Sequence, residues 1–360
     1  MSEDHLIPVL IDDSISCLKF FPSKEIDYLA SGGWDSKLRL FEIKYQIINQ
    51  DYLQSEKTQI NSNQISSCQH QSPILSMSWA GNSGGILTSC VDGSINYVDM
   101  QKNIYTKIGQ HQYGCKEVLY LSNYNNIIAS GGWDGKINLW DLKSKNPICS
   151  YQFKNKIYTM SCGKNLLVVG LSEVLLAYFN LAKLQQNIFE PEAIVLSPLR
   201  EQSRKVEVFK EDNGFAIGSL EGRVSLKFIN LNLAPQINQE TKSFFTENGF
   251  AFRCHREYKD NICYVFPIND LSINPVYGSL CTVGGDGKYC IWDINNKSKI
   301  NERENYNDNC PLTACAYNYS GNLLAYSSGY DWMKGAISAK DYSKPKIFIH
   351  YLKDSHRKKS

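Results

Sequence analysis

The chain has 360 residues, of which 42% are hydrophobic and 21% are charged, and its formal net charge is +2. A charge this small excludes strong bulk attraction to nucleic acid or to an acidic membrane surface. The amino-terminal stretch MSEDHLIPVL has no basic region followed by an apolar core, so no secretory signal is expected. The longest apolar run is interrupted by Ser172 and Glu173 and falls short of the roughly 20 residues that span a bilayer. We therefore expect a soluble intracellular protein without membrane insertion.

The cysteines do not form a metal or disulfide pattern. All 12 are scattered without a C-x-x-C, and most lie in strand-like apolar runs such as SISCLKF and TACAYN. Such cysteines behave as small buried hydrophobes. Cys254 and His255 are the only adjacent Cys/His pair, and they lack the further ligands of a zinc site. No metal and no cofactor are expected.

In chain order, a pattern of small residues, a turn and an apolar strand recurs. Its copies are SGGWDSKLRLFEI (31–43), TSCVDGSINYVDM (88–100), SGGWDGKINLWDL (130–142), VVGLSEVLLAYFNL (168–181), GSLEGRVSLKFINL (218–231), VGGDGKYCIWDI (283–294) and a diverged SSGYDWMKG (327–335) followed by KIFIHYL (346–352). Another alternating run precedes each copy, from SISCLKF at the start to LTACAYN near the end. Period-2 alternation with intervening turn residues predicts an all-β protein made of seven units.

Each copy carries an acidic residue in its turn. These residues recur at intervals of roughly 40 to 65 residues, against the roughly 40 to 45 residues of a WD-type propeller blade. The excess falls near 45–68, 182–203 and 232–248, which we expect to be surface insertions. We predict a seven-bladed WD-repeat β-propeller over residues 1–352 with a short basic tail at 353–360. The segment HLIPVLI would close the ring as the outer strand of the last blade, since an open ring leaves sheet edges unpaired.

The turn residues are expected to have structural roles. In such blades the turn aspartate accepts hydrogen bonds from the turn backbone, and a histidine before the first strand often joins it. NLWDL and CIWDI add the aromatic residue that is buried between neighbouring blades. Because the acidic residues are spread one per blade, no paired-carboxylate site and no enzyme are expected. The expected structural residues are Asp35, His70, Asp92, His111, Asp134, Glu221 and Asp286.

Five segments carry a resemblance to a known family. They are DDSISCLKFFP (12–22), GFAIGSLEGRVSLKFIN (214–230), FAFRCHRE (250–257), NDLSINPVYGSLCTVGGDGKYCIWD (269–293) and GNLLAYSSGYDWMKG (321–335). In these segments the chain resembles the nuclear mRNA export factor propellers that dock on nucleoporins, whose close sister is the spindle-checkpoint propeller. Both branches share the Glu-Gly-Arg and Cys-His-Arg segments, whereas YSSGYDWMKG resembles the export branch. The fourth blade and the inserts near 45 and 235 depart from the family pattern.

The resemblance implies a function without chemistry. It implies a scaffold that binds a GLEBS-type acidic segment of a nucleoporin and supports mRNA export through the nuclear pore. The implied location is the nucleus, the nuclear pore complex and the nuclear envelope, with some protein in the cytoplasm. The chain would be a monomeric propeller in a hetero-complex. The sister branch implies the alternative, a checkpoint adaptor that binds GLEBS-type segments of checkpoint kinases.

Tryptophan in a tight turn is the most unusual local feature. Trp34 and Trp133 each precede a turn aspartate, and Tyr330 holds the equivalent place in the last blade. We expect all three on the top face near the channel. Burying a large side chain against a partner contributes roughly 1.5 to 3 kcal/mol, and aromatic residues dominate binding hot spots. The alternative is that each tryptophan folds back over its own blade.

Arginines near these turns could complete the site. Arg223 in SLEGRV and Arg256 in FRCHRE can each hold a carboxylate bidentately, although either could be a solvated surface residue. The resemblance implies that they grip acidic residues of the GLEBS segment. Lys227 and Arg253 are weaker candidates for the same role.

Direct RNA binding is the remaining class. Arg200, Arg204, Lys205 and Lys210 cluster before the fifth blade, and the tail KDSHRKKS is basic. Together they could support weak, salt-dependent contact with RNA. The alternative is a solvated face and a frayed terminus.

Overall fold

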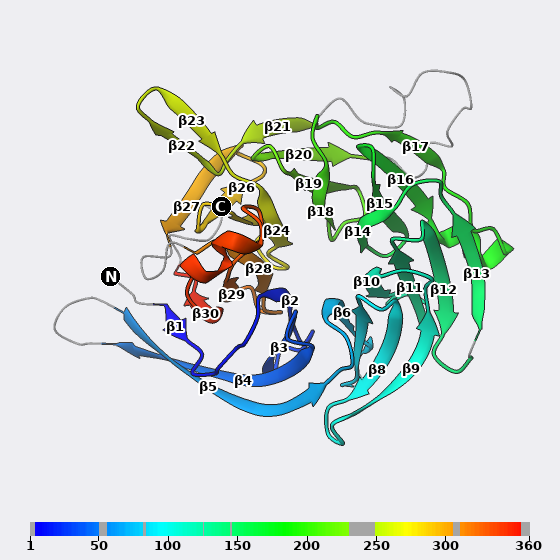
Figure 1. Ribbon diagram of the computed structural model, residues 1–360, viewed down its shortest axis with the longest axis horizontal. Coiled ribbons are helices and arrows are strands. Elements are labelled where there is room, and N and C mark those ends of the chain that lie inside the picture. Colours follow the sequence, from blue (N-terminus) through cyan, green and yellow to red (C-terminus); the bar gives the residue numbers. More distant parts are fainter. Residues whose placement is uncertain are drawn as a thin grey trace.

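The computed structural model describes residues 4–49, 56–81, 84–124, 126–144, 146–229, 249–304 and 310–353. Within them, seven four-stranded antiparallel sheets surround a central axis (Figure 1), and an eighth, two-stranded sheet stands between the fifth and sixth blades. This confirms the seven-bladed all-β propeller. Six blades run outward in chain order, so the first strand of each lines the channel and its last strand lies at the rim; in the seventh blade the outer strand comes from the amino-terminal segment.

The first four blades have these strands: β2 (Ile15–Phe20), β3 (Asp27–Gly33), β4 (Lys37–Asn49), β5 (Glu56–Gln69); β6 (Ile74–Trp79), β7 (Ile86–Cys90), β8 (Ser94–Asp99), β9 (Ile104–Gln110); β10 (Cys115–Tyr120), β11 (Ile127–Gly132), β12 (Lys136–Asp141), β13 (Pro147–Gln152); β14 (Ile157–Cys162), β15 (Leu166–Leu171), β16 (Leu175–Asn180), β17 (Ala193–Leu196). The remaining strands are β18 (Ser203–Val208), β19 (Gly214–Ser219), β20 (Arg223–Phe228), β21 (Phe250–Arg253); the separate β22 (Arg256–Lys259) and β23 (Ile262–Val265); β24 (Ile268–Ile273), β25 (Leu280–Gly284), β26 (Lys288–Asp293), β27 (Ser298–Glu304); β28 (Leu312–Tyr317), β29 (Leu323–Ser328), β30 (Lys346–Tyr351) and β1 (His5–Leu6).

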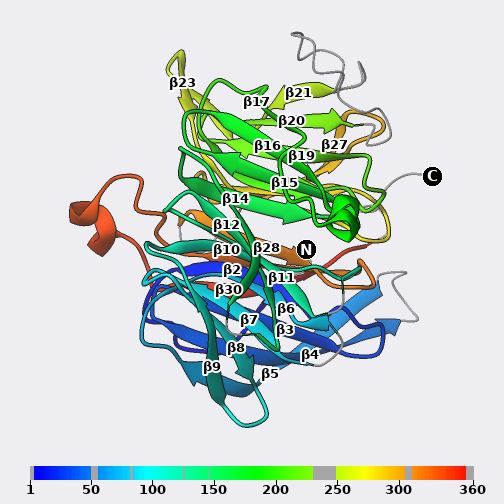
Figure 2. The same cartoon turned by 90° about the vertical axis from the view of Figure 1, so that its right-hand side faces the viewer.

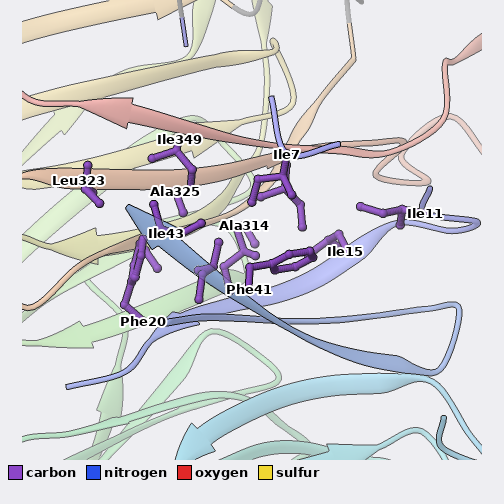
Figure 3. Close-up of a cluster of buried hydrophobic side chains, with 14 residues drawn as sticks. Ile7, Ile11, Ile15, Phe20, Phe41, Ile43, Ala314, Leu323, Ala325 and Ile349 are labelled. Carbon is purple, nitrogen blue, oxygen red and sulfur yellow. The ribbon is translucent and has the colours of Figure 1, made fainter. Parts of the chain in front are cut away.

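The core lies between blades, where apolar faces of neighbouring sheets meet. Figure 3 shows the junction of the first and last blades, at which Ile15 and Phe41 meet Ala314 and Ile349. Ile7 joins them from the amino-terminal segment and is 2% exposed. Because neighbouring blades cover both faces of a sheet, successive side chains along a strand pack alternately against one neighbouring blade and the other.

The ring is closed by the amino-terminal strand, as predicted. β1 pairs with β30 in antiparallel register, with His5 opposite Ile349 and Leu6 opposite Phe348. The preceding residue, Asp4, is held by two side chains: one carboxylate oxygen lies 2.7 Å from His350 Nδ1 and 2.6 Å from Arg303 Nη1. This segment is thus held by the strand pairing and by the Arg303–Asp4 ion pair with its neighbouring hydrogen bonds.

Two expected insertions are seen, and they differ in form. The stretch near 45–68 continues the β4–β5 hairpin beyond the blade, and 182–203 contains most of the 3₁₀ helix η2 (Leu181–Gln186) and then β17. The third insertion, 232–248, and the tail residues 354–360 lie outside the described residues, so the domain boundary near 352 stays a prediction. Among the described helices, none is long and apolar enough to cross a membrane.

The last blade has an additional surface element. The 3₁₀ helix η3 (Ala336–Asp341) lies between β29 and β30 and stands out from one face of the disc (Figure 2). We call this face, on which the turn between the second and third strands of each blade opens, the top face. Helix η3 therefore rises beside any ligand bound at the top of the channel.

Candidate functional site

A pocket of about 750 Å³ occupies the mouth of the channel on the top face. Its wall includes the turn residues Trp34, Trp133 and Leu220 from three different blades, and Trp332 from the last blade. Aromatic rings from several rigid sheets thus converge on one concavity, which is the usual form of a ligand or peptide site.

The floor of the pocket is built by a repeated irregularity. The innermost strand of every blade carries a register shift against the second strand, in the same place near its start. A β-bulge of this kind re-aims one side chain. All seven bulge residues line the pocket: Ser16, Leu75, Lys116, Tyr158, Arg204, Asn269 and Thr313. We call them the bulge ring.

Trp34 and Trp133 both line the pocket, but Trp34 is the more exposed of the two. Trp34 is 41% exposed, and its backbone N–H donates to the Ser14 carbonyl at 2.9 Å. Trp133 is less exposed because its ring lies over Gly114, where an added Cβ would come within 2.5 Å of the ring. Gly114 is therefore needed for this close approach. Trp133 both packs on its own blade and offers a face to the pocket.

Tyr330 lines the pocket but is not the exposed anchor that the sequence suggested. It is 6% exposed, its hydroxyl donates to the Gly335 carbonyl at 2.7 Å, and its ring stacks on Tyr342 with centroids 4.6 Å apart. The β29–β30 segment folds over it. The exposed aromatic residue of this blade is Trp332, at 46%, two positions later in the same YDW sequence.

Arg223, Arg253 and Arg256, the arginines predicted to bind the partner, do not line the pocket. Arg256 Nη2 donates to the Glu221 carbonyl at 2.8 Å, and Arg223 Nε lies 3.5 Å from a Glu221 carboxylate oxygen. Arg253 pairs with Arg223 across β20 and β21 and is exposed. These three arginines surround the turn whose Leu220 reaches the pocket. Lys227 lies at the other end of β20, opposite Phe215, and is remote from this turn.

Blade 3 contains a chain of hydrogen bonds through four side chains, Asp134, His111, Ser130 and Trp140, which fixes its turn and which we call the relay. Asp134 lies 3.0 Å from His111 Nδ1, His111 Nε2 lies 2.8 Å from Ser130 Oγ, and Trp140 Nε1 donates to that oxygen at 2.8 Å. Burial would raise the pKa of Asp134, but hydrogen bonding to His111 and to the backbone outweighs burial and lowers it. The turn that carries Trp133 is thereby held in place.

Blade 6 contains the same relay, which the sequence analysis missed. His255 Nδ1 lies 2.8 Å from Asp286, His255 Nε2 lies 2.8 Å from Thr282, and Trp292 Nε1 donates to Thr282 at 3.1 Å. The β22–β23 hairpin separates His255 from its strand in sequence, and this hides the pattern. The available signal was the six-residue spacing of Asp286 and Trp292, which equals that of Asp134 and Trp140.

The other turn residues are held differently. Asp35 pairs with Arg39 of its own blade at 2.5 Å, with both side chains under 5% exposed. Asp92 accepts from Ser94, at 3.0 Å from the backbone N–H and 2.7 Å from the hydroxyl. Glu221 accepts from the Arg200 N–H at 3.1 Å. Each satisfies a turn locally.

The channel below the pocket contains a buried charge cluster. Lys205 Nζ lies 3.4 Å from Glu117 and 3.8 Å from Asp270, and Ser76 Oγ donates to Glu117 at 2.6 Å. Burial would raise the pKa of Glu117, but the ammonium groups of Lys205 and Lys116 outweigh burial and lower it. Lys205 is therefore part of the channel, not of a basic surface.

The remaining basic residues before blade 5 also diverge. Arg204 Nη2 donates to Asn269 inside the pocket at 3.0 Å, Lys210 Nζ donates to the Pro275 carbonyl at 3.0 Å, and Arg200 is exposed. Within the described residues no three His, Cys, Asp or Glu side chains form a metal-ligand group, and all 12 cysteines are free. The pocket presents aromatic rings and the cations Lys116 and Arg204.

The fold and these relays define the chain as a WD-repeat propeller. The family described as "WD domain, G-beta repeat" matches residues 6–42 and 103–141. The chain is 29% identical to the "Poly(A)+ RNA export protein" of Schizosaccharomyces pombe, over 94% of this chain and 88% of that protein. It is 31% identical to the "mRNA export factor" of Xenopus tropicalis, over 94% and 86%. "Mitotic checkpoint protein bub3" of Dictyostelium discoideum is 26% identical over 94% and 92%. The chain belongs to the mRNA export factor family of WD-repeat propellers.

Proposed function

We propose that this chain is a non-enzymatic scaffold that supports mRNA export through the nuclear pore by binding a GLEBS-type acidic segment of a nucleoporin on its top face. Family membership supports the export role. The observation that carries the binding site is the pocket at the channel mouth, with Trp34 and Trp332 exposed at its wall. The scaffold acts as a monomer in a hetero-complex, in the nucleus, at the nuclear pore complex and nuclear envelope, and partly in the cytoplasm.

The physical basis is the burial of aromatic surface next to cations. Trp34 is 41% and Trp332 is 46% exposed, and covering each fully would contribute at most roughly 1.5 to 3 kcal/mol. Arg223, Arg253 and Arg256 surround the neighbouring turn that contains Glu221. Because a guanidinium group can bind a carboxylate, these arginines suit glutamates at the edge of the bound segment. The rigid blades order a segment that is disordered when free, so the ordering cost falls on the partner.

Binding of a labelled GLEBS segment by fluorescence anisotropy tests this function. Trp34→Ala and Arg223→Glu should each weaken binding about tenfold or more, because each removes an anchor at the site. Both should keep the circular dichroism and thermal unfolding of the wild type, since both side chains are at least partly exposed. The matched control is Ile148→Ala with Lys102→Glu, which removes an exposed apolar residue and a lysine elsewhere. Unchanged affinity in both test variants would refute the site.

The checkpoint alternative rests on the 26% identity to "Mitotic checkpoint protein bub3". An adaptor of that kind would use the same face to bind GLEBS-type segments of a mitotic checkpoint kinase. Pull-downs from interphase and mitotic extracts, with the wild type and with Trp34→Ala/Arg223→Glu, separate the two. A nucleoporin recovered only by the wild type supports export, whereas recovery of kinetochore kinases alone supports the checkpoint role.

Weak RNA binding is the third function considered. Its proposed residues do not form one surface, because Lys205 lies in the channel cluster and Arg204 is bonded to Asn269. A titration of RNA binding with salt checks it: a steep loss of affinity with rising salt would support contacts to phosphate.

A further inference from the structure

The seven members of the bulge ring are not chemically equivalent. Ser16, Arg204, Asn269 and Thr313 each hydrogen-bond to another group of the protein. Leu75 is apolar and 4% exposed. These five residues have their contacts within the protein and serve mainly to build the wall of the pocket.

The remaining two members, Lys116 of β10 and Tyr158 of β14, differ from them. They come from adjacent blades, both line the pocket, and both are half-buried. Neither the Lys116 ammonium nor the Tyr158 hydroxyl has a hydrogen-bond or ion-pair partner among the described residues. Two neighbouring donors are therefore left for a ligand.

The carboxylate next to Lys116 in sequence attracts it without forming an ion pair: the Lys116 ammonium helps to lower the pKa of Glu117, but the Glu117 oxygens contact other groups. Glu117 is 2% exposed and forms its contacts with Ser76 and Lys205. A half-buried ammonium without an ion pair gains a charge-assisted hydrogen bond when an anion enters the pocket. Lys116 is therefore set to gain from an incoming anion.

The chemistry around these donors narrows the ligand. Trp133, Leu75 and Trp34 share the pocket with Lys116 and Tyr158 and give it apolar walls. Two carboxylates also line it, but both accept hydrogen bonds within the protein: Asp13 from the Ser14 N–H, and Asp331 from Asn269 and the Met333 N–H. Aromatic rings alone would also suit a cation such as a methylated lysine, but Lys116 would repel it. A carboxylate accepting charge-assisted hydrogen bonds, on a segment that also carries apolar side chains, fits both features.

We propose that Lys116 and Tyr158 form a carboxylate-binding subsite in the channel mouth, which holds one acidic side chain of the bound peptide while a neighbouring apolar side chain packs on Trp133. The subsite rests on the proposed function, because its ligand is the same acidic segment. It is separate from Arg223 and Arg256, which surround Glu221 outside the pocket. The bound segment is thus gripped at two places on the top face.

The test uses the full chain and the GLEBS segment, as the natural peptide and as a series with each glutamate replaced in turn by glutamine. Lys116→Met should weaken binding of the natural peptide about tenfold and Tyr158→Phe about threefold. One peptide of the series should bind the wild type and Lys116→Met equally, since its missing carboxylate is the one that Lys116 holds. Lys136→Met is the control: this exposed lysine of the same blade does not line the pocket, and its loss should change affinity less than about twofold.

Each other outcome has a distinct meaning. If binding depends on Trp34 and is unchanged in Lys116→Met, the subsite is refuted and the proposed function stands. An equal loss in Lys116→Met and Lys136→Met, or a loss that no glutamine peptide removes, refutes the carboxylate contact. If Lys116→Met loses binding of a single-stranded RNA oligonucleotide but keeps the peptide, Lys116 serves RNA instead. Failure of the wild type to bind any nucleoporin segment refutes function and subsite together.

Discussion

Blades 2 and 3 look alike in sequence and differ in structure. Both have a histidine before the first strand and an aspartate in the turn, and both were expected to join the two. In blade 3 the distance from His111 to Asp134 is 3.0 Å, and the aspartate side chain is 4% exposed. In blade 2, Asp92 is exposed and bonds to Ser94, while the His70 ring lies 3.0 Å from the Thr88 hydroxyl through Nε2 and stacks on Tyr105.

The difference follows from the residue six positions after the aspartate. It is Trp140 in blade 3 and Val98 in blade 2. An indole N–H can only donate, so the hydroxyl of Ser130 accepts from Trp140 and gives its own proton to His111 Nε2. The other ring nitrogen of His111 then carries the proton that reaches Asp134. Without a tryptophan this direction is not imposed, and the turn of blade 2 is satisfied by its own serine.

The largest effect that would break this comparison is loss of the turn aspartate. Asp134→Ala should lower the free energy of unfolding by about 3 kcal/mol, because it leaves a buried histidine donor and two backbone N–H groups, of Gln112 and Lys136, without their acceptor. Asp92→Ala should cost about 1 kcal/mol, since it loses two local bonds at an exposed turn. Urea unfolding of both variants measures this. Equal losses would show that the relay adds nothing.

A smaller effect is expected from the tryptophan itself. Trp140→Phe should cost about 2 kcal/mol, because it removes the donor to Ser130 and part of a ring that packs on Gly109 of blade 2. The matched variant is Trp79→Phe, a buried tryptophan outside any relay. In an Asp134→Asn background the cost of Trp140→Phe should fall, whereas that of Trp79→Phe should not. A cost that stays the same in both backgrounds contradicts coupling through the relay.

The fold was largely predictable because it is written in a repeated local pattern. Alternation along seven units gave the blades, and the unpaired edge of the last unit required a closing strand, which β1 provides. The bulge ring was not predictable, because a one-residue register shift leaves no mark on an alternating run as short as CKEVLY.

The site was predictable only in part. Turn tryptophans could be placed on the top face from their position in the repeat. Whether an aromatic stays exposed depends on what folds over it, and the β29–β30 segment covers Tyr330 while leaving Trp332 exposed. His255 was missed for a related reason, since a hairpin inserted in the chain separates it from its relay partners. A repeat pattern in the sequence does not show which distant segment folds over a side chain, and it is interrupted where a hairpin is inserted between partners.

The smallest expected effect is a difference in pH dependence between the two blades. Burial lowers the pKa of His70 from 6.5, so its stabilising contribution is present above pH 6.5 and is lost as pH falls through the lowered value. The pKa of Asp134 is lowered from 3.8, so its contribution is lost only below that value. The free energy of unfolding, measured with urea from pH 8 to pH 3, should therefore fall less steeply with decreasing pH than in the wild type. In His70→Gln this difference should appear just below pH 6.5, and in Asp134→Asn it should appear near pH 3. If the two variants change the same part of the profile, the two turns do not titrate as separate units and the contrast between the blades fails.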